Sequence, residues 1–151
     1  MIVLEQETNA ITHIVSESCK AKAQIVQEDE LETSGRRAIL NYGHTFAHAL
    51  ESVSGYGKLL HGEAVSIGMH MAALLAARLG RVSTEFVQRQ EALLKRLQLP
   101  TRYADAAPDK LWQAMQSDKK VQHGQLRFVL PSRFGHVELV PDVTREDACE
   151  A

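Results

Sequence analysis

An almost wholly apolar run from Ala64 to Leu79 constrains the fold of this chain more than any other stretch. A helix that is apolar on nearly every side must lie at the centre of a folded core. The run contains His70, has Arg78 near its end and is too short to cross a bilayer, which takes about 20 apolar residues. We therefore expect a central core helix, from about Glu63 to Leu79, that ends at Gly80.

The segments around this helix show the periodicity of further amphipathic helices. Gly55 and Gly57 separate the central helix from one that carries Arg37, Asn41, His44 and His48 along one stripe. Two short apolar runs flank the turn SRFG and predict a β-hairpin. The first expected helix covers residues 2–28, and the next follows a cap at Thr33 or Ser34 and reaches Val53. A helix over 84–97 is capped by Ser83 or Thr84, with Phe86, Val87, Leu93, Leu94 and Leu97 inward, and a shorter one over 108–115 is anchored by Trp112. The expected strands cover residues 126–131 and 136–140, and a last helical turn covers 143–149. The sequence predicts a mainly α, multi-helix domain with one small β-hairpin near its C-terminus.

Composition excludes several classes of function. The formal charge is −2, from 17 basic and 19 acidic residues, and only 5% of residues are aromatic, so nothing indicates a nucleic-acid partner. The cysteines, Cys19 and Cys149, form no CxxC pattern and predict free thiols in a reducing compartment. The N-terminus has no basic leader typical of a signal peptide. We expect a cytoplasmic protein with no membrane partner.

Three histidines lie close together in sequence around the Gly-Tyr-Gly turn: His44, His48 and His61, with Glu51 and Glu63 between and after them. The first two are four residues apart, which places both imidazoles on one helix face, as in zinc-binding helices. Thr45 follows His44, so the HExxH motif of a zinc protease is absent. Spacing alone predicts a site for a metal or an anion and leaves open that these are ordinary helix and loop histidines.

The motifs LNYGHTFAHALE and GYGKLLHGEAVSIGM resemble the hallmark of the 3-dehydroquinate synthase family, within the sugar-phosphate cyclases. The flanking segments KAQIVQEDELETSGRR and SDKKVQHGQLRFVLP resemble the same family, so the likeness covers nearly the whole chain. It implies that residues 1–151 form the family's single C-terminal, metal- and substrate-binding helical domain. The implied reaction, a step of the shikimate pathway, converts 3-deoxy-D-arabino-heptulosonate 7-phosphate to 3-dehydroquinate and phosphate.

The resemblance also implies roles for individual residues. His44 and His61 match the family's two histidine ligands to zinc, and His48 matches a histidine beside the substrate phosphate. Residue spacing alone favours a solvated lysine at Lys22, but the resemblance gives it a role in the site. The remaining implied site residues are Lys22, Arg37 and Asn41 at the substrate carboxylate and neighbouring oxygens, Lys119 or Lys120 near the phosphate, and Glu32 lining the site.

The implied cofactors are Zn²⁺, or another divalent metal, and NAD. The family's N-terminal dinucleotide-binding domain and its zinc-binding glutamate have no counterpart in this sequence, which lacks a Gly-rich phosphate loop. The full enzyme is expected to be a homodimer, and this chain alone to bind zinc weakly and not to turn over. The alternatives are the same domain of a sister cyclase with another sugar phosphate, or a non-catalytic helical remnant.

Overall fold

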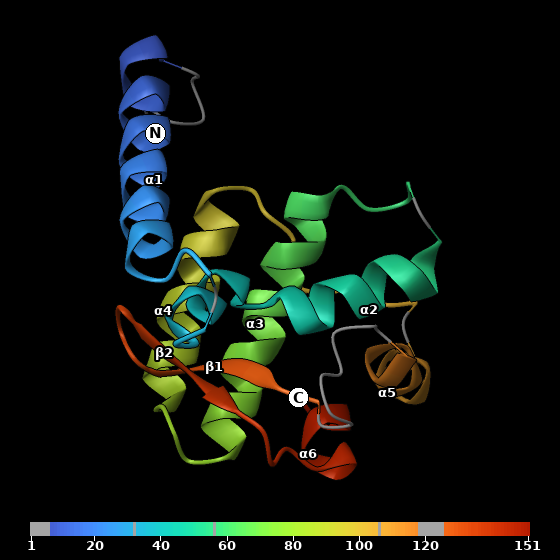
Figure 1. Ribbon diagram of the computed structural model, residues 1–151. Helices are drawn as coiled ribbons and strands as arrows, with labels where there is room; N and C mark the ends of the chain where they lie inside the picture. Colours follow the sequence, from blue (N-terminus) through green and yellow to red (C-terminus); the bar gives the residue numbers. More distant parts are fainter. Residues whose placement is uncertain (1–6, 32, 56, 106, 118–125) are drawn as a thin grey trace. The chain divides into compact units, whose positions relative to one another are not determined.

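The computed structural model describes residues 7–31, 33–55, 57–105, 107–117 and 126–151 (Figure 1). The chain divides into two compact units, Met1–Leu40 and Asn41–Ala151. The described structure is mainly helical with one two-stranded antiparallel sheet, as the sequence predicts. The elements in order are α1 (Thr8–Glu28), η1 (Arg36–Asn41), α2 (His44–Ser54), α3 (His61–Arg78), α4 (Thr84–Arg96), α5 (Pro108–Ser117), β1 (Phe128–Arg133), β2 (His136–Val140) and α6 (Arg145–Cys149).

The first unit is built on α1, which runs unbroken to Glu28 as its uninterrupted helical periodicity predicts. None of its residues is buried, and the apolar side chains Ile11, Ile14 and Val15 are 39–55% exposed. Their spacing predicts the helix correctly, but none of the three belongs to a core cluster of the described residues. Cys19 is a free, exposed thiol on the same helix.

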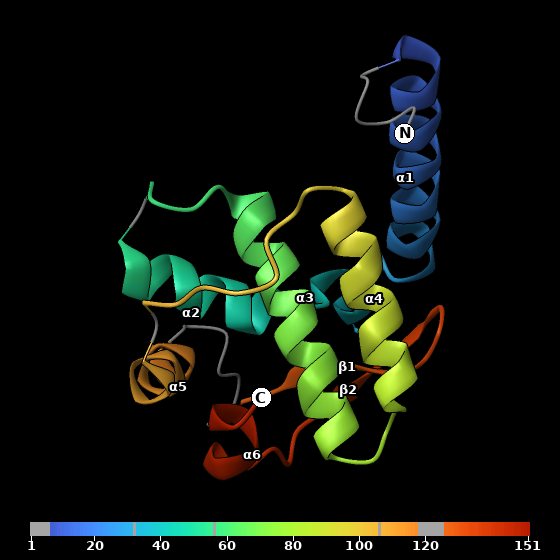
Figure 2. The same cartoon turned by 180° about the vertical axis from the view of Figure 1, so that it is seen from behind.

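In the second unit, α3 occupies the central position that its apolar sequence predicts. It contacts α2, α4, α6 and β1, and the two opposite views show it running between α2 and α4 (Figures 1 and 2). Ile67 and Leu75 on α3 are almost fully buried against Phe46 and Leu50 of α2. In the described residues no helix is long and apolar enough to span a membrane.

Two glycines allow the backbones of α2 and α3 to touch. A Cβ atom at Gly68 would lie 2.2 Å from the carbonyl oxygen of Gly43, closer than real Cβ atoms approach. Gly43 itself has φ +80°, in the left-handed region that favours glycine. The crossing therefore fixes the position of Gly43 against α3, one residue before α2 begins at His44.

The same glycine corrects one expectation. The sequence predicts a continuous helix carrying Arg37, Asn41, His44 and His48 on one stripe, and this is wrong. The chain forms the 3-10 helix η1, turns through Gly43 and starts α2 at His44. Only the two histidines share a helix face, because the left-handed residue breaks the helical register between Asn41 and His44.

The remaining elements follow the predicted order with local differences. Ser83 caps α4 by accepting a hydrogen bond from the Phe86 N–H at 3.2 Å. Leu93, expected to be buried, is 56% exposed, whereas Leu94 is buried. On α5, Leu111 is buried and Trp112 packs against the core from a partly exposed position. The two hairpin strands pair from Phe128 opposite Val140 at one end to Arg133 opposite His136 at the turn. The buried residues of β1 cover α3.

Candidate functional site

One face of α2 carries His44, His48 and Glu51. Steps of four and three residues bring these side chains into line on a helix. All three are partly buried, and the opposite face of α2 places Phe46 and Leu50 in the core. The helix thus presents two imidazoles and one carboxylate away from the core.

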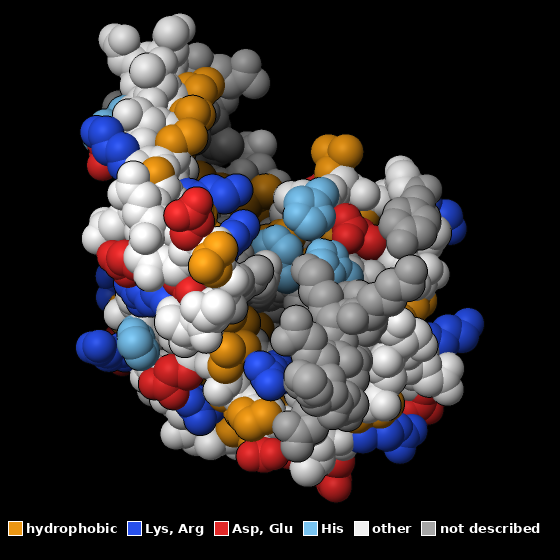
Figure 3. Space-filling model, in the orientation of Figure 1, with side chains coloured by type: hydrophobic (Ala, Val, Ile, Leu, Met, Phe, Trp, Pro, Cys, Tyr) orange, Lys and Arg blue, Asp and Glu red, His pale blue; other side chains and the backbone are white. Residues whose placement is uncertain are grey.

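The chain turns after Ser54 and brings His61, the first residue of α3, to these side chains. Gly55 and Gly57 both have positive φ in this turn, at +86° and +94°. The ring centres of His61 and His44 are 5.5 Å apart, those of His44 and His48 are 5.7 Å apart, and those of His48 and His61 are 6.3 Å apart. Figure 3 shows histidine side chains gathered on one face beside an acidic side chain.

Hydrogen bonds orient two of these rings in the same sense. His44 Nδ1 donates to the carbonyl oxygen of Tyr42 at 3.2 Å, and His61 Nδ1 donates to Glu51 Oε1 at 3.0 Å. Because neither a carbonyl nor a carboxylate can donate, the proton must sit on Nδ1 in both rings. Each neutral ring then carries its lone pair on Nε2, the arrangement found in histidines that bind metals.

Tyr42 connects the ring of His44 to the core. Its hydroxyl donates to Gln90 Oε1 at 2.7 Å and lies 3.2 Å from the Met69 carbonyl, which also accepts from Gln90 Nε2. Burial raises the pKa of Tyr42 to about 12, only partly opposed by the bond to Gln90. The backbone carbonyl that orients His44 is therefore held by α3 and α4.

The residues expected to bind the substrate carboxylate fall partly in the first unit. Lys22 is exposed on α1, and Arg37 is partly buried in η1, where its Nη1 donates to the Glu30 carbonyl at 3.3 Å. Asn41, also partly buried, is the first residue of the second unit. Glu32, Lys119 and Lys120 lie outside the residues that the structure describes.

Asp29 organises the loop between α1 and η1, a role that the sequence analysis missed. Its side chain is buried, and its carboxylate accepts the backbone N–H groups of Thr33, Ser34 and Arg37 at 2.9–3.1 Å. These bonds lower the pKa of Asp29 to about 2. The bond from the Ser34 N–H has the largest effect, and that from the Arg37 N–H the next largest. The segment QEDELETSG, which ends in Ser-Gly, is typical of a loop, but nothing in it singles out Asp29 among its four acidic residues.

The donor set fits part of a metal site. Zinc binds imidazole nitrogen at ~2.0–2.1 Å in tetrahedral geometry, which places two liganding rings roughly 5 Å apart between centres. His44 and His61, at 5.5 Å with both Nδ1 atoms hydrogen-bonded to oxygen, match that requirement. Within the described ranges no three His, Cys, Asp or Glu side chains form a group that could hold a metal ion. The pair thus offers two donors.

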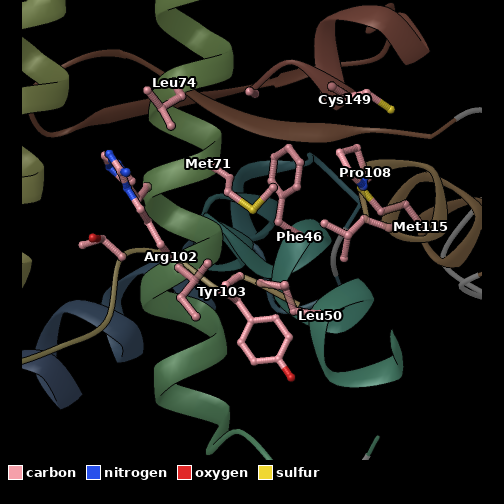
Figure 4. A pocket seen from close by; sticks show the side chains of 16 residues that line it. Phe46, Leu50, Met71, Leu74, Arg102, Tyr103, Pro108, Met115 and Cys149 are labelled. Carbon is pink, nitrogen blue, oxygen red and sulfur yellow. The ribbon is translucent and has the colours of Figure 1, made fainter. Parts of the chain in front are cut away.

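A cavity of about 470 Å³ lies on the other face of α2 (Figure 4). The residues that line it include Phe46 and Leu50 of α2, Met71 of α3, Met115 of α5, and Arg102 and Tyr103 from the segment between α4 and α5. Positions 46 and 50 point away from positions 44 and 48 on a helix, so this cavity is separate from the histidine cluster. Its walls are chiefly apolar, and the charged and polar groups of the candidate site are not among them.

Solved structures place the fold among the sugar-phosphate cyclases. The 2-epi-5-epi-valiolone synthase of Streptomyces hygroscopicus, solved with NAD⁺ and Zn²⁺, superposes with a TM-score of 0.80 at 27% identity, over 95% of this chain and 39% of that one. A 2-deoxy-scyllo-inosose synthase, solved with carbaglucose-6-phosphate, NAD⁺ and Co²⁺, superposes with a TM-score of 0.73 at 27% identity. The match covers 87% of this chain and 37% of that one.

The family model for the 3-dehydroquinate synthase C-terminal region matches residues 2–121 of this chain, and the chain belongs to this family. It is 52% identical over 149 residues to the 3-dehydroquinate synthase of Rhodopirellula baltica, covering 99% of this chain and 40% of the relative. The chain is 47% identical to the 3-dehydroquinate synthase of a Synechococcus, over 95% of this chain and 40% of the relative. It is 48% identical to the 3-dehydroquinate synthase of Gloeobacter violaceus, over 93% of this chain and 39% of the relative. The chain thus spans about 40% of the length of these relatives.

Proposed function

We propose that this chain is the C-terminal, metal- and substrate-binding part of a 3-dehydroquinate synthase. The reaction is the conversion of 3-deoxy-D-arabino-heptulosonate 7-phosphate to 3-dehydroquinate with loss of phosphate, a lyase step of the shikimate pathway toward chorismate and the aromatic amino acids. The observation that carries the proposal is the meeting of His44, His48 and His61, from α2 and α3, in a segment about half identical to curated synthases.

His44 and His61 are proposed to bind the divalent metal through Nε2. The Nδ1 contacts with Tyr42 and Glu51 support this, because they direct the lone pairs of both rings to that atom. A third protein donor would complete the coordination of a catalytic zinc. When bound, the metal would supply Lewis acidity to a substrate hydroxyl, so that its oxidation by NAD becomes easier at neutral pH.

The other residues are proposed to orient a doubly anionic substrate. His48, on the same helix face as His44, would donate a hydrogen bond to the phosphate, and Lys119 or Lys120 would supply a positive charge there. Lys22, Arg37 and Asn41 would bind the carboxylate and neighbouring oxygens, and Glu32 would line the site. Charge-assisted hydrogen bonds of this kind are short and directional, so they fix the substrate before chemistry occurs.

The relatives favour this reaction over that of a sister cyclase. Identity to curated 3-dehydroquinate synthases is 47–52%, against 27% for the solved valiolone and scyllo-inosose synthases. The oriented imidazoles argue against a non-catalytic remnant, since a helical module without a site has no need to hold two Nδ1 atoms on oxygen acceptors. NAD and the nucleotide-binding domain are proposed partners in the whole enzyme, which we expect to be a cytoplasmic homodimer.

The test joins this chain to the N-terminal portion of the Rhodopirellula baltica enzyme and measures phosphate release from 3-deoxy-D-arabino-heptulosonate 7-phosphate with NAD and Zn²⁺. We expect release that is abolished by His44→Ala and by His61→Ala but kept by His13→Ala, a change at an exposed histidine of α1. A chimera that folds and binds NAD and Zn²⁺ but releases no phosphate would overturn the assigned reaction and favour a sister cyclase.

A further inference from the structure

Glu51 contacts the histidine cluster through its carboxylate, and neither the family resemblance nor residue spacing gives it a role. Its Oε1 atom lies 3.0 Å from His61 Nδ1. The Glu51 side chain is 20% exposed and stands on α2 next to the buried Leu50, whereas the His61 side chain is 59% exposed at the first position of α3. The better-anchored carboxylate therefore restrains the more exposed imidazole.

This contact decides which nitrogen of His61 can bind a metal. Neutral histidine in water favours the form protonated on Nε2, which cannot ligate through that atom. A carboxylate at Nδ1 stabilises the opposite form, with its lone pair on Nε2, and also fixes the plane of the ring. The backbone carbonyl of Tyr42 does the same for His44 at 3.2 Å. The two rings are thus prepared alike from two different acceptors.

We propose that Glu51 is a positioning residue that sets the tautomer and orientation of His61 for metal binding. The proposal rests on the proposed function, in which His61 is a metal ligand. Glu51 touches neither metal nor substrate in this role and acts through the ring it holds. Such outer carboxylates change metal affinity by about 10- to 100-fold when they are removed.

The second glutamate of the motif has a different task and supplies a matched control. Glu63 stands in the first turn of α3, where its Oε2 atom accepts the backbone N–H of Leu60 at 2.9 Å and caps the helix. Glutamine serves equally well at this position of a capping box. Glu63→Gln therefore removes one negative charge near His61 while keeping the helix start intact.

The first measurement follows the imidazole nitrogens of His61 by ¹⁵N NMR of the whole chain at pH 8 without metal. We expect the Nδ1–H form in the wild type and a shift toward the Nε2–H form in Glu51→Ala. Glu51→Gln keeps a neutral acceptor oxygen and should give an intermediate result, and Glu63→Gln should match the wild type. A His61 tautomer that is the same in wild type and Glu51→Ala would overturn the proposal.

The second measurement titrates the same proteins with Zn²⁺ alone. We expect Glu51→Ala to bind zinc about 10- to 100-fold more weakly than Glu63→Gln, with circular dichroism verifying that both remain folded. If His44→Ala and His61→Ala weaken binding but Glu51→Ala does not, the positioning role is wrong and the metal pair stands. If neither histidine variant differs from His13→Ala, the metal pair itself is wrong and the role of Glu51 falls with it.

Discussion

At the scale of single residues, the candidate site depends as much on acceptors as on the histidines. The spacing of His44 and His48 predicts their shared helix face, and the Gly55–Gly57 turn predicts the return of His61 to it. The sequence does not indicate that Tyr42 and Glu51 orient two of the rings, since both contacts depend on side-chain directions set by packing. Asp29 shows the same limit, because a buried carboxylate cannot be told from a solvated one by its neighbours in the chain.

His70 is the buried ionisable residue of the central helix, and it should make stability depend on pH. Its side chain is 4% exposed, and burial lowers the pKa of the imidazole, partly opposed by Glu91, whose Oε1 lies 3.8 Å from Nε2. With a folded pKa below the unfolded value near 6.5, protons bind preferentially to the unfolded chain. The stability that the neutral, buried His70 contributes is fully present above about pH 6.5, and it is lost as pH falls through the folded pKa.

We therefore expect the melting temperature to fall between pH 7.5 and pH 5, and to fall less in His70→Gln, which has no proton to gain. Thermal melts by circular dichroism across this range measure the difference. His13→Gln, at an exposed histidine of α1, is the control for the loss of a histidine elsewhere in the chain. Equal slopes in wild type and His70→Gln would contradict the assignment.

Asp29 offers a second test, local to the loop that it organises. With a pKa of about 2 the carboxylate stays charged well below the ordinary range for aspartate, so its bonds persist until strong acid and weaken as pH falls from about 3.8 through 2. Asp29→Asn keeps one acceptor oxygen and loses the other. We expect faster amide hydrogen exchange at Ser34 and Arg37, compared with Glu30→Gln at the exposed neighbouring carboxylate. Unchanged exchange would show that the loop does not depend on Asp29.

At the scale of helices and strands, hydrophobic periodicity was sufficient for most of the fold. It predicts α1, the central α3, the capped α4 and the hairpin, because each is a local pattern. It fails at Gly43, where a left-handed residue separates η1 from α2, since the close crossing that demands glycine there comes from α3, far along the chain. It fails also at Leu93, because periodicity indicates a helix face without showing how far the neighbouring helices extend over it.

The crossing of α2 and α3 predicts a large cost for one methyl group. Gly68→Ala would place Cβ 2.2 Å from the Gly43 carbonyl oxygen and 3.0 Å from the Ala47 nitrogen, both backbone atoms that cannot move aside cheaply. We expect a loss of about 1–3 kcal/mol or more in the free energy of unfolding, as for other overpacked cores. Because the shift displaces the start of α2, the proposed zinc binding by His44 should weaken as well.

Gly62→Ala is the matched control on the same helix. A Cβ atom there meets nothing within 4 Å, and Gly62 is only the second residue of α3, so alanine should leave the free energy of unfolding unchanged or raise it by less than ~1 kcal/mol. Urea unfolding of the two variants measures both changes. A Gly68→Ala protein as stable as the wild type would mean that the two backbones do not approach as closely as described.

At the scale of the whole molecule, the chain corresponds to about 40% of its curated relatives and divides into two units. The candidate metal pair lies in the second unit, while Lys22 and Arg37 belong to the first. The residues proposed for the site thus come from both units.

This division leads to the last prediction, that residues 1–151 alone will not turn over 3-deoxy-D-arabino-heptulosonate 7-phosphate even with NAD and Zn²⁺ supplied. The sequence has no Gly-rich loop to hold a dinucleotide phosphate, and the described residues offer two metal donors where a catalytic zinc has three. Without hydride transfer the substrate proton next to the phosphate-bearing carbon is not acidified, so phosphate has no route to leave. Phosphate release, measured beside the full-length Rhodopirellula baltica enzyme as positive control, checks this. Turnover within a factor of about 100 of that enzyme, which corresponds to less than ~3 kcal/mol of barrier, would show that this chain holds the catalytic apparatus by itself.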